Sequence, residues 1–211
     1  MTQSDNHPKT GPARVECLKT ETLADAHFRY ERLTLRTELF AGSLSPTYLR
    51  EILRSGQAVV VLLYDPRLHQ VILIEQFRIG AYVNHLPSNW ILECVAGMVD
   101  EGEDRETAAR REAVEETGCE VGEIQYVGSY LSSPGLLDEI VSIYIGEVDA
   151  QKAGGVHGHE GEGEDIRTHV FPVEEALALM DQGAIVNIMA QTALLWFARH
   201  GESLRQRWLD R

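Results

Sequence analysis

The sequence predicts an α+β fold, with mixed sheets and helices packed in layers, for a chain of 211 residues. Short apolar, β-branched runs alternate with turn residues, and several stretches without Gly or Pro suit helices. The two kinds of element do not alternate regularly, as a doubly wound parallel sheet would require. Hydrophobic residues make up 44% of the chain, so it can bury a full core rather than remain disordered.

The N-terminal quarter is predicted to hold a tail, strands and one short helix. Residues 1–14 are polar and suit a flexible tail, whereas residues 15–40 alternate in places between apolar and polar side chains, which favours strands. In the stretch that follows, Ser45 is positioned to cap a short helix, Pro46 to occupy its first turn and Gly56 to end it.

The remaining elements are predicted from apolar runs and from their Gly and Pro boundaries. Strands are expected at 58–64 and 71–77 around a turn at 65–70, in the apolar run Trp90–Val95, and at 124–131 and 140–148. Helices are expected at 104–117, ended by Gly118, at 173–182 after Pro172, and at 187–200; a Gly-rich acidic loop spans 151–165. The predicted organisation is a tail (1–14), an N-terminal module (15–56) and a larger domain (57–211).

Composition excludes several classes of function. The formal net charge is −14 and no cluster of Lys and Arg is present, so binding to nucleic acid is not expected. The three cysteines, Cys17, Cys94 and Cys119, form no CxxC pair, which argues against disulfides and zinc. The polar N-terminus is no signal peptide and the apolar runs are too short to cross a bilayer, so we expect a cytoplasmic protein without membrane contacts.

The chemistry is predicted to lie in residues 97–119, GMVDEGEDRETAARREAVEETGC. Glu112, Glu115 and Glu116 are three and four residues apart, which places their carboxylates on one face of the predicted helix. Like charges at this spacing repel, so the cluster favours a divalent cation, and carboxylate oxygens suit magnesium or manganese. Three glutamates alone would also fit a solvated, charged helix face.

The rest of the segment decides against that plain interpretation. It fits the pattern G-x5-E-x7-R-E-U-x-E-E-x-G-U, where U is a bulky apolar residue, and it resembles the Nudix box. Ala113 and Cys119 are smaller than the usual residues at the U positions, which affects packing and leaves the acidic residues intact. The resemblance implies metal binding by Glu112, Glu115, Glu116 and the backbone carbonyl of Ala96, with structural support from Gly97, Glu103, Arg111 and Gly118.

The resemblance extends over the whole chain, which is similar to bacterial ADP-ribose pyrophosphatases of the Nudix superfamily. It rests on the N-terminal module, on LIEQFRIGAY at 73–82, on Ser133-Pro134-Gly135 beyond the box, and on the acidic loop HGHEGEGEDI at 157–166. It implies an α/β/α sandwich of mixed sheets, with the module at 15–56 joining two copies as a homodimer.

The same resemblance implies the remaining site residues. Glu162 is the expected general base and Glu164 a further metal ligand, although flanking glycines allow these roles to be exchanged. Magnesium is the expected cofactor, with two or three ions per site and manganese as an alternative. The implied substrate contacts are His27, Phe28, Arg50, Glu51, Arg78, Met98, Ser133, Gly135 and Glu139. The segment LLDE (136–139) departs from the family's polar, Gly-containing turn, which puts the ribose contacts there in question.

The resemblance implies hydrolysis of ADP-ribose to AMP and ribose 5-phosphate. Another nucleotide sugar, such as GDP-mannose, is the nearest alternative, since only the base and sugar pockets would differ. An enzyme for oxidised nucleoside triphosphates fits less well, because this chain is longer and has the N-terminal module. A non-catalytic ADP-ribose sensor on the same fold is a remote alternative, because such modules lose the box glutamates that this chain keeps.

Overall fold

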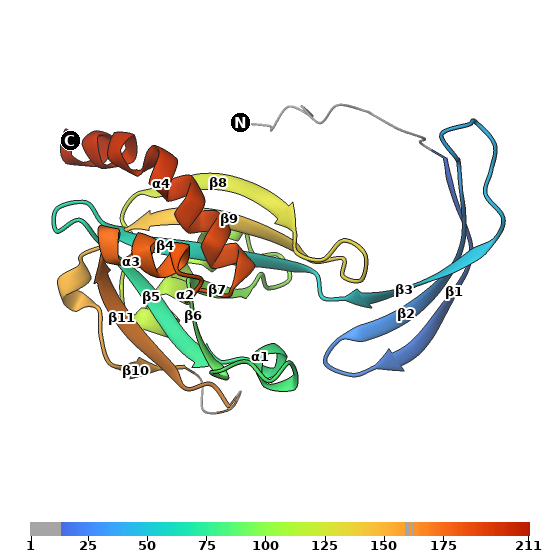
Figure 1. The fold of residues 1–211 in the computed structure, drawn as a ribbon, viewed down its shortest axis with the longest axis horizontal. Coiled ribbons are helices and arrows are strands. Elements are labelled where there is room, and N and C mark those ends of the chain that lie inside the picture. The colour runs from blue at the N-terminus through green and yellow to red at the C-terminus, as the bar shows by residue number, and fades with distance from the viewer. Residues whose placement is uncertain (1–13, 159–160, 162) are drawn as a thin grey trace. The chain divides into compact units, whose positions relative to one another are not determined.

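The computed structural model describes residues 14–158, 161 and 163–211 and is shown in Figure 1. The chain forms two compact units. The smaller unit contains the chain up to Ser55 together with Ser133–Asp138, and the larger unit contains Gly56–Ser132 and Glu139–Arg211.

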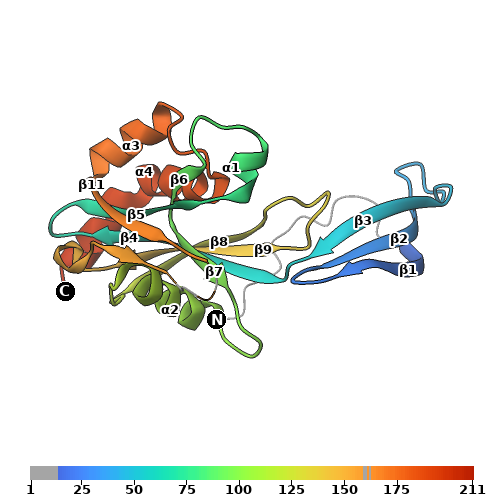
Figure 2. The ribbon, with the colours of Figure 1, turned by 90° about the horizontal axis from the view of Figure 1, so that it is seen from below.

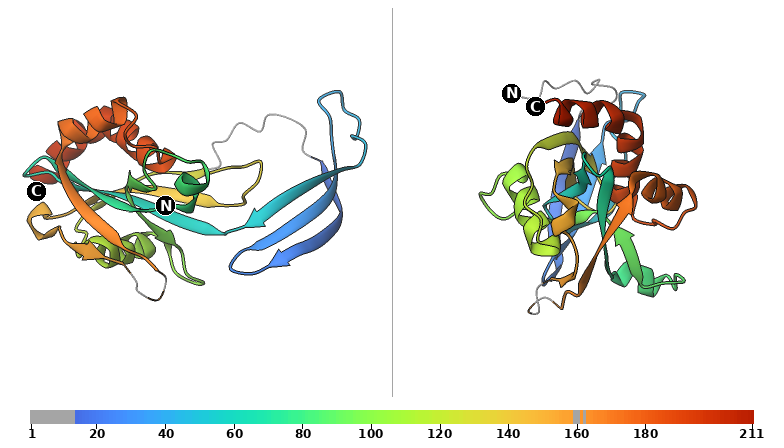
Figure 3. Two further views of the ribbon diagram at one scale, coloured as in Figure 1. Left: turned by 60° about the horizontal axis from the view of Figure 1, so that its bottom comes forward. Right: turned by 90° about the vertical axis from the view of Figure 1, so that its left-hand side faces the viewer.

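The smaller unit is built on an antiparallel sheet with the order β1-β2-β3 (Figure 3). Its strands are β1 (Val15–Asp25), β2 (Arg29–Thr37) and β3 (Tyr48–Arg54). The strands predicted within 15–40 are therefore confirmed. Ser133–Asp138 joins this unit through β3, where the backbone of Leu53 bonds to Leu136 and Asp138.

The short helix predicted at 45–56 is wrong, because this stretch forms β3. The stretch is extended because it pairs with β2. Glu51 lies opposite Arg32 on β2 and accepts hydrogen bonds from its guanidinium at 2.6 and 3.1 Å. Ser45 does not cap a helix; its hydroxyl oxygen accepts a bond from the backbone N–H of Thr37. Tertiary pairing of this kind overrides a weak local helix signal.

The larger unit contains a mixed sheet with the strand order β10-β11-β5-β4-β9-β8, to which β6 adds beside β5 and β7 beside β4. Only the β4–β9 pair is parallel among the described strands. The strands are β4 (Gln57–Asp65), β5 (Gln70–Phe77), β6 (Trp90–Glu93), β7 (Val95–Met98), β8 (Ile124–Leu131), β9 (Ile140–Glu147), β10 (Val156–His157) and β11 (Ile166–Pro172).

Helices cover both faces of this sheet (Figure 2). The helices are α1 (Ile79–Val83), α2 (Arg105–Thr117), η1 (Ala150–Lys152), α3 (Val173–Asp181) and α4 (Ile188–Leu209). Alternate residues of β4 enter two separate cores: Val59, Val61 and Leu63 pack in the core that holds the alanines of α2, and Val60, Leu62 and Tyr64 in the core under α3 and α4. Burial on both faces explains why this strand is apolar throughout. The α+β class with an α/β/α sandwich is confirmed.

Helix α4 continues nine residues beyond the predicted end at His200. Gly201 follows the predicted end, and glycine commonly ends helices. In the structure Gly201 is buried, and a Cβ atom at this position would lie 2.8 Å from the ring of Phe197. Beyond it, Leu204 and Trp208 are buried in the core. Glycine therefore serves close packing inside the helix here.

Most other predicted elements are present, including the strands at 58–64, 71–77, 124–131 and 140–148 and the helices at 104–117 and 173–182. The predicted loop at 151–165 contains the end of η1 and the short strand β10. The sequence analysis missed β11 and α1. Among the described helices, none has both the length and the apolar character required to span a membrane.

Candidate active site

Helix α2 is held at both ends, which fixes the direction of its acidic face. The side chain of Asp104 caps its N-terminus by accepting hydrogen bonds from the backbone N–H groups of Glu106 and Thr107. Gly118 ends the helix with φ of 71°, in the left-handed region that suits glycine. The helix packs against β7, the strand that precedes the box loop. The carboxylates of α2 are thereby directed toward the backbone at 96–98.

Gly97 leaves space beside β7 for the Glu112 carboxylate. A Cβ atom at position 97 would overlap the carboxyl group of Glu112. One residue earlier, the backbone N–H of Ala96 donates to Oε2 of Glu116 at 3.1 Å. Strand β7 therefore contacts two of the predicted metal ligands through its backbone, and the glycine permits a close approach that any side chain would block.

Arg111 organises the loop before α2. Its guanidinium donates to both oxygens of Glu103 at 3.1 Å and to the carbonyl oxygen of Met98 at 3.0 Å. It also reaches Glu112 at 2.7 Å and Glu115 at 2.9 Å, and these carboxylates raise the pKa of Arg111. Arg111 thus bonds the loop residues Met98 and Glu103 to helix α2.

Burial gives the acidic face an unusual electrostatic character. Glu116 is only 4% exposed, and burial raises its pKa to about 8, with the charges of Glu112 and Glu164 adding to the shift. Burial also raises the pKa of Glu112, with further contributions from the charges of Glu115 and Glu164. Several carboxylates therefore lie close enough to oppose one another's ionisation, which a cation would relieve.

The acidic loop reaches this face through Glu164. Its charge contributes to the raised pKa values of Glu112, Glu116 and Arg78, so it lies within electrostatic range of the carboxylates of α2. The loop is closed at its base, because a Cβ atom at Gly158 would lie 2.9 Å from the Cβ and the carbonyl oxygen of Glu164. Glu162, the predicted general base, lies outside the described residues.

The donor set fits a divalent cation chemically. Glu112, which is half-buried, Glu116, which is buried, and Glu164, which is exposed, offer hard carboxylate oxygens, the ligand type that magnesium and manganese prefer. As arranged, no three acidic, histidine or cysteine side chains among the described residues converge on one point, and Arg111 bridges Glu112 and Glu115. Arg111 bonds to Oε1 of Glu112 and to both oxygens of Glu103.

A second polar network lies at the end of β5. Arg78 donates from Nε to Glu93 at 2.6 Å and from Nη2 to its other oxygen at 3.3 Å, and Asn187 donates to the same oxygen at 2.6 Å. The sequence analysis named Arg78 but missed Glu93 and Asn187. The signal for Glu93 was present, because a single carboxylate inside the apolar run at 90–95 is expected to be buried and paired.

The other predicted substrate residues are divided between the units. In the smaller unit, the rings of His27 and Phe28 are 4.4 Å apart, Arg50 lies over the Tyr48 ring, and Glu51 is bound by Tyr30 and Arg32. Ser133 and Gly135 also belong to this unit and are exposed. In the larger unit, Met98 is 38% exposed and adjoins the box loop, and Glu139 begins the segment that leads into β9.

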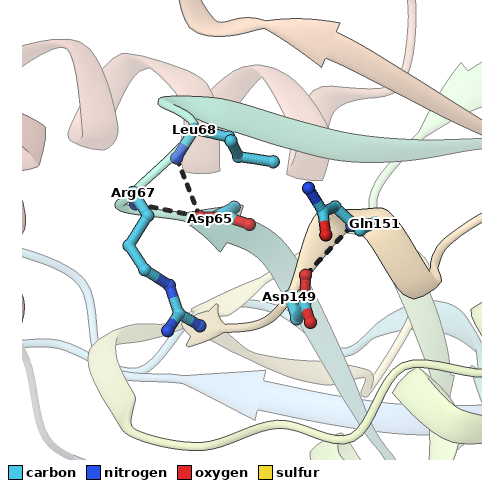
Figure 4. Close-up of a pocket in the computed structure, with 5 residues that line it drawn as sticks. All are labelled: Asp65, Arg67, Leu68, Asp149 and Gln151. Carbon is cyan, nitrogen blue, oxygen red and sulfur yellow. Dashed lines mark hydrogen bonds between the residues drawn. The ribbon is translucent and has the colours of Figure 1, made fainter.

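A cavity of about 250 Å³ lies elsewhere in the larger unit, lined by Asp65, Arg67, Leu68, Asp149 and Gln151 (Figure 4). Its carboxylates hold the local backbone. Asp65 accepts bonds from the N–H groups of Arg67, Leu68 and Ala150, and Asp149 accepts one from Gln151. These acids stabilise the turns that line the cavity.

Comparison with known proteins shows which sequences this chain resembles. The model of the NUDIX domain family matches residues 54–191. An ADP-ribose pyrophosphatase of Escherichia coli (strain K12) is 44% identical over 209 residues, which cover 99% of this chain and all of the relative. An ADP-ribose pyrophosphatase of Haemophilus influenzae is 40% identical over 92% of this chain and 90% of the relative.

More distant similarities point to the same fold. A GDP-mannose pyrophosphatase of Citrobacter koseri is 34% identical over 90% of this chain and 97% of the relative. Among solved structures, an ADP compounds hydrolase superposes with a TM-score of 0.68 at 19% identity, covering 91% of this chain and 98% of that one. At such low identity the structural likeness concerns the fold alone.

Proposed function

The chain belongs to the NUDIX domain family, and from this premise we propose that it hydrolyses the pyrophosphate bond of ADP-ribose to AMP and ribose 5-phosphate, in a reaction that depends on a divalent metal. The observation that carries the proposal is the buried carboxylate face of α2, where Glu112 and Glu116 lie against the backbone of β7. The choice of substrate is supported by 44% identity over the whole chain to relatives named ADP-ribose pyrophosphatase.

The proposed metal ligands are Glu112, Glu115, Glu116, Glu164 and the carbonyl oxygen of Ala96, and the proposed ions are two or three Mg²⁺. Bound divalent ions offset the negative charge of the phosphates and lower the pKa of a water molecule. Gly97 keeps the Glu112 carboxylate close to β7, and Arg111, through Glu103, keeps the loop on the helix. Manganese is the alternative ion.

The remaining roles concern the substrate. We propose that Arg78 binds a phosphate, because a guanidinium matches phosphate geometry and its charge lies beside the acidic face. Glu162 is proposed to take the proton of the attacking water. Phe28 is proposed to stack on adenine, since its side chain is 37% exposed. The other proposed substrate contacts are His27, Arg50, Glu51, Met98, Ser133, Gly135 and Glu139.

We further propose a homodimer. Among the described residues of the smaller unit, no hydrophobic side chain is buried, and Leu18, Phe28, Phe40 and Leu49 are exposed by 37% or more. A small sheet needs an apolar face packed against another surface to be stable in water. A second subunit would provide that surface, and two-fold pairs are the commonest closed assemblies.

A substrate panel tests the function. Purified protein is incubated with Mg²⁺ and either ADP-ribose, GDP-mannose or a nucleoside triphosphate, and AMP, GMP and phosphate are measured separately. We expect AMP from ADP-ribose as the fastest reaction, and a loss of several orders of magnitude in the folded Glu112→Gln variant or with excess chelator. Faster release of GMP from GDP-mannose would assign the protein to the alternative substrate. Tight binding of ADP-ribose without turnover would indicate a sensor.

A further inference from the structure

We infer that Glu93 and Asn187 are positioning residues that hold the Arg78 guanidinium in the orientation that receives a phosphate of the substrate. The inference rests on the proposed function, in which Arg78 binds a phosphate. It adds two residues that do not touch the substrate themselves and act through Arg78. All three belong to the larger unit, and each contact among them is direct.

Glu93 is placed to fix the arginine. Its side chain is only 2% exposed, whereas the Arg78 side chain is 42% exposed. One edge of the guanidinium, carrying Nε and Nη2, is bound to the buried carboxylate at 2.6 and 3.3 Å. A planar guanidinium held along one edge has little freedom to rotate. The exposed part of the side chain is therefore presented in a constant direction.

Asn187 in turn fixes Glu93. Its Oδ1 accepts hydrogen bonds from the backbone N–H groups of Met189 and Ala190 and caps helix α4, so its Nδ2 is directed toward Glu93 at 2.6 Å. Both ends of the amide are used, which determines its orientation. The start of a 22-residue helix thereby anchors the carboxylate that holds Arg78.

The orientation matters because carboxylates also lie nearby. Burial lowers the pKa of Arg78, but the charges of Glu93, Glu116 and Glu164 raise it more. Released from Glu93, the arginine would be free to turn toward the charges of Glu116 and Glu164, the carboxylates proposed to bind metal. The network on Glu93 therefore keeps Arg78 available for the substrate and keeps the acidic face available for the cation.

Gln76 gives separate support for a bound acceptor at this place. It is only 5% exposed, and its side-chain amide nitrogen has no hydrogen-bond partner. The backbone is extended through Arg78, with φ of −128° and ψ of 122°, so side chains two residues apart leave the strand on the same side. A buried donor without a partner is costly, and a phosphate oxygen beside Arg78 would satisfy it.

A double-mutant cycle on binding tests the inference. The probe is α,β-methylene-ADP with Mg²⁺, a nucleoside diphosphate analogue whose P–C–P bridge resists hydrolysis, and its affinity is measured by calorimetry. We expect Glu93→Gln to weaken binding about tenfold in the wild-type background and to have little further effect in an Arg78→Ala background, because residues that act through one another are not additive. With ADP-ribose as substrate, the same variant should raise KM by a similar factor and change kcat less.

Two variants at Asn187 separate positioning from folding. Serine and aspartate both remain good helix caps, so Asn187→Ser and Asn187→Asp should leave the melting temperature of the chain nearly unchanged. Asn187→Ser removes the donor to Glu93, and Asn187→Asp also places a second carboxylate beside it. We expect the aspartate variant to weaken binding more than the serine variant. Glu75→Gln on β5 serves as the control, because Glu75 pairs with His169 rather than with Arg78.

Equal weakening by Glu93→Gln in both backgrounds, or unchanged binding in all Glu93 and Asn187 variants, would overturn the inference. Failure of the wild-type protein to bind the analogue would overturn it as well, whether or not ADP-ribose is hydrolysed. By contrast, an intact coupling between Glu93 and Arg78 in a protein that does not hydrolyse ADP-ribose would support the positioning network and reject the proposed function.

Discussion

The absence of a side chain at Gly97 allows the Glu112 carboxylate to lie against β7. Gly97→Ala would force the Glu112 carboxylate away from β7, because the added Cβ overlaps it. We expect kcat for ADP-ribose to fall roughly 100-fold or more, since small displacements of catalytic groups have effects of that size. Gly80→Ala is the matched control, because a Cβ there meets open space. Kinetics of both folded variants measure the effect, and similar rates for the two would show that the position of Glu112 is not critical.

The raised pKa of Glu116 predicts how the free energy of unfolding depends on pH when no metal is bound. Its pKa is raised from 4.5 to about 8, mainly by burial, so the folded protein holds a proton that the unfolded chain releases at lower pH. The free energy of unfolding should therefore fall as the pH rises from about 4.5 to about 8. Relative to Glu116→Gln, the wild type should lose on the order of 2 kcal/mol between roughly pH 5.5 and 7.5.

Urea unfolding in a chelator measures this difference, and the comparison of the two proteins cancels the titration of groups that do not interact with Glu116. Parallel curves for wild type and Glu116→Gln would show that Glu116 ionises normally in the folded state. Added Mg²⁺ should reduce the difference, because a bound cation favours the ionised carboxylate.

At the residue level, sequence spacing was informative where one helix carries the chemistry. The spacing of Glu112 and Glu116, together with Gly97, anticipated a face that the structure presents to β7. The contacts of Glu93 with Arg78 and Asn187 could not be anticipated in the same way. These residues are 15 and 94 positions from Glu93, and only the pairing of strands and the entry of α4 bring them together.

Helix α4 allows a test of packing against propensity. Replacing a helical glycine with alanine usually stabilises a helix by about 1 kcal/mol. At Gly201, however, the new methyl group would lie 2.8 Å from the buried ring of Phe197. Overpacking costs about 1–3 kcal/mol, so Gly201→Ala should lower the free energy of unfolding by about 1 kcal/mol.

Denaturant unfolding measures this change, and Ser203→Ala on the exposed side of the same helix is the control. The control should remain within about 0.5 kcal/mol of the wild type. Stabilisation by Gly201→Ala would mean that the core under α4 has room for a methyl group.

At the scale of elements, the sequence predicts those whose signal is local and misses those formed by distant pairing. Helix α2 has its capping residue and its glycine stop directly at its two ends, and its bounds were predicted closely. Strand β3 follows a Ser-Pro start that resembles a helix cap, but its cross-strand contacts with β2 decide its structure. Strand β11 was missed because it lies beside the Gly-rich loop and pairs with β5, almost a hundred residues earlier in the chain.

At the scale of the whole molecule, the exposed apolar side chains of the smaller unit support the proposed homodimer. In such a dimer, either subunit could supply the proposed adenine contacts. In the proposed homodimer, the partner's N-terminal module would supply these contacts. A dimer of this kind has twice the 23.6 kDa chain mass, which light scattering at micromolar concentration should show. Mass alone does not establish sharing, because a dimer could also contain two self-sufficient sites.

Mixed dimers test whether each active site takes residues from both subunits. A Phe28→Ala subunit keeps the proposed metal ligands, and a Glu112→Gln subunit keeps the ring proposed to stack on adenine, while each variant alone should have little activity. If each site uses Phe28 from the partner, a mixed dimer contains one intact site and one that lacks both groups. Random co-assembly of equal amounts makes half of the dimers mixed, so the preparation should reach about one quarter of wild-type activity. Doubly tagged, affinity-purified mixed dimers should reach about one half. Activity no higher than that of the parent variants would place Phe28 and Glu112 of the same subunit in one site, and a monomer that hydrolyses ADP-ribose at the full rate would remove the need for a partner.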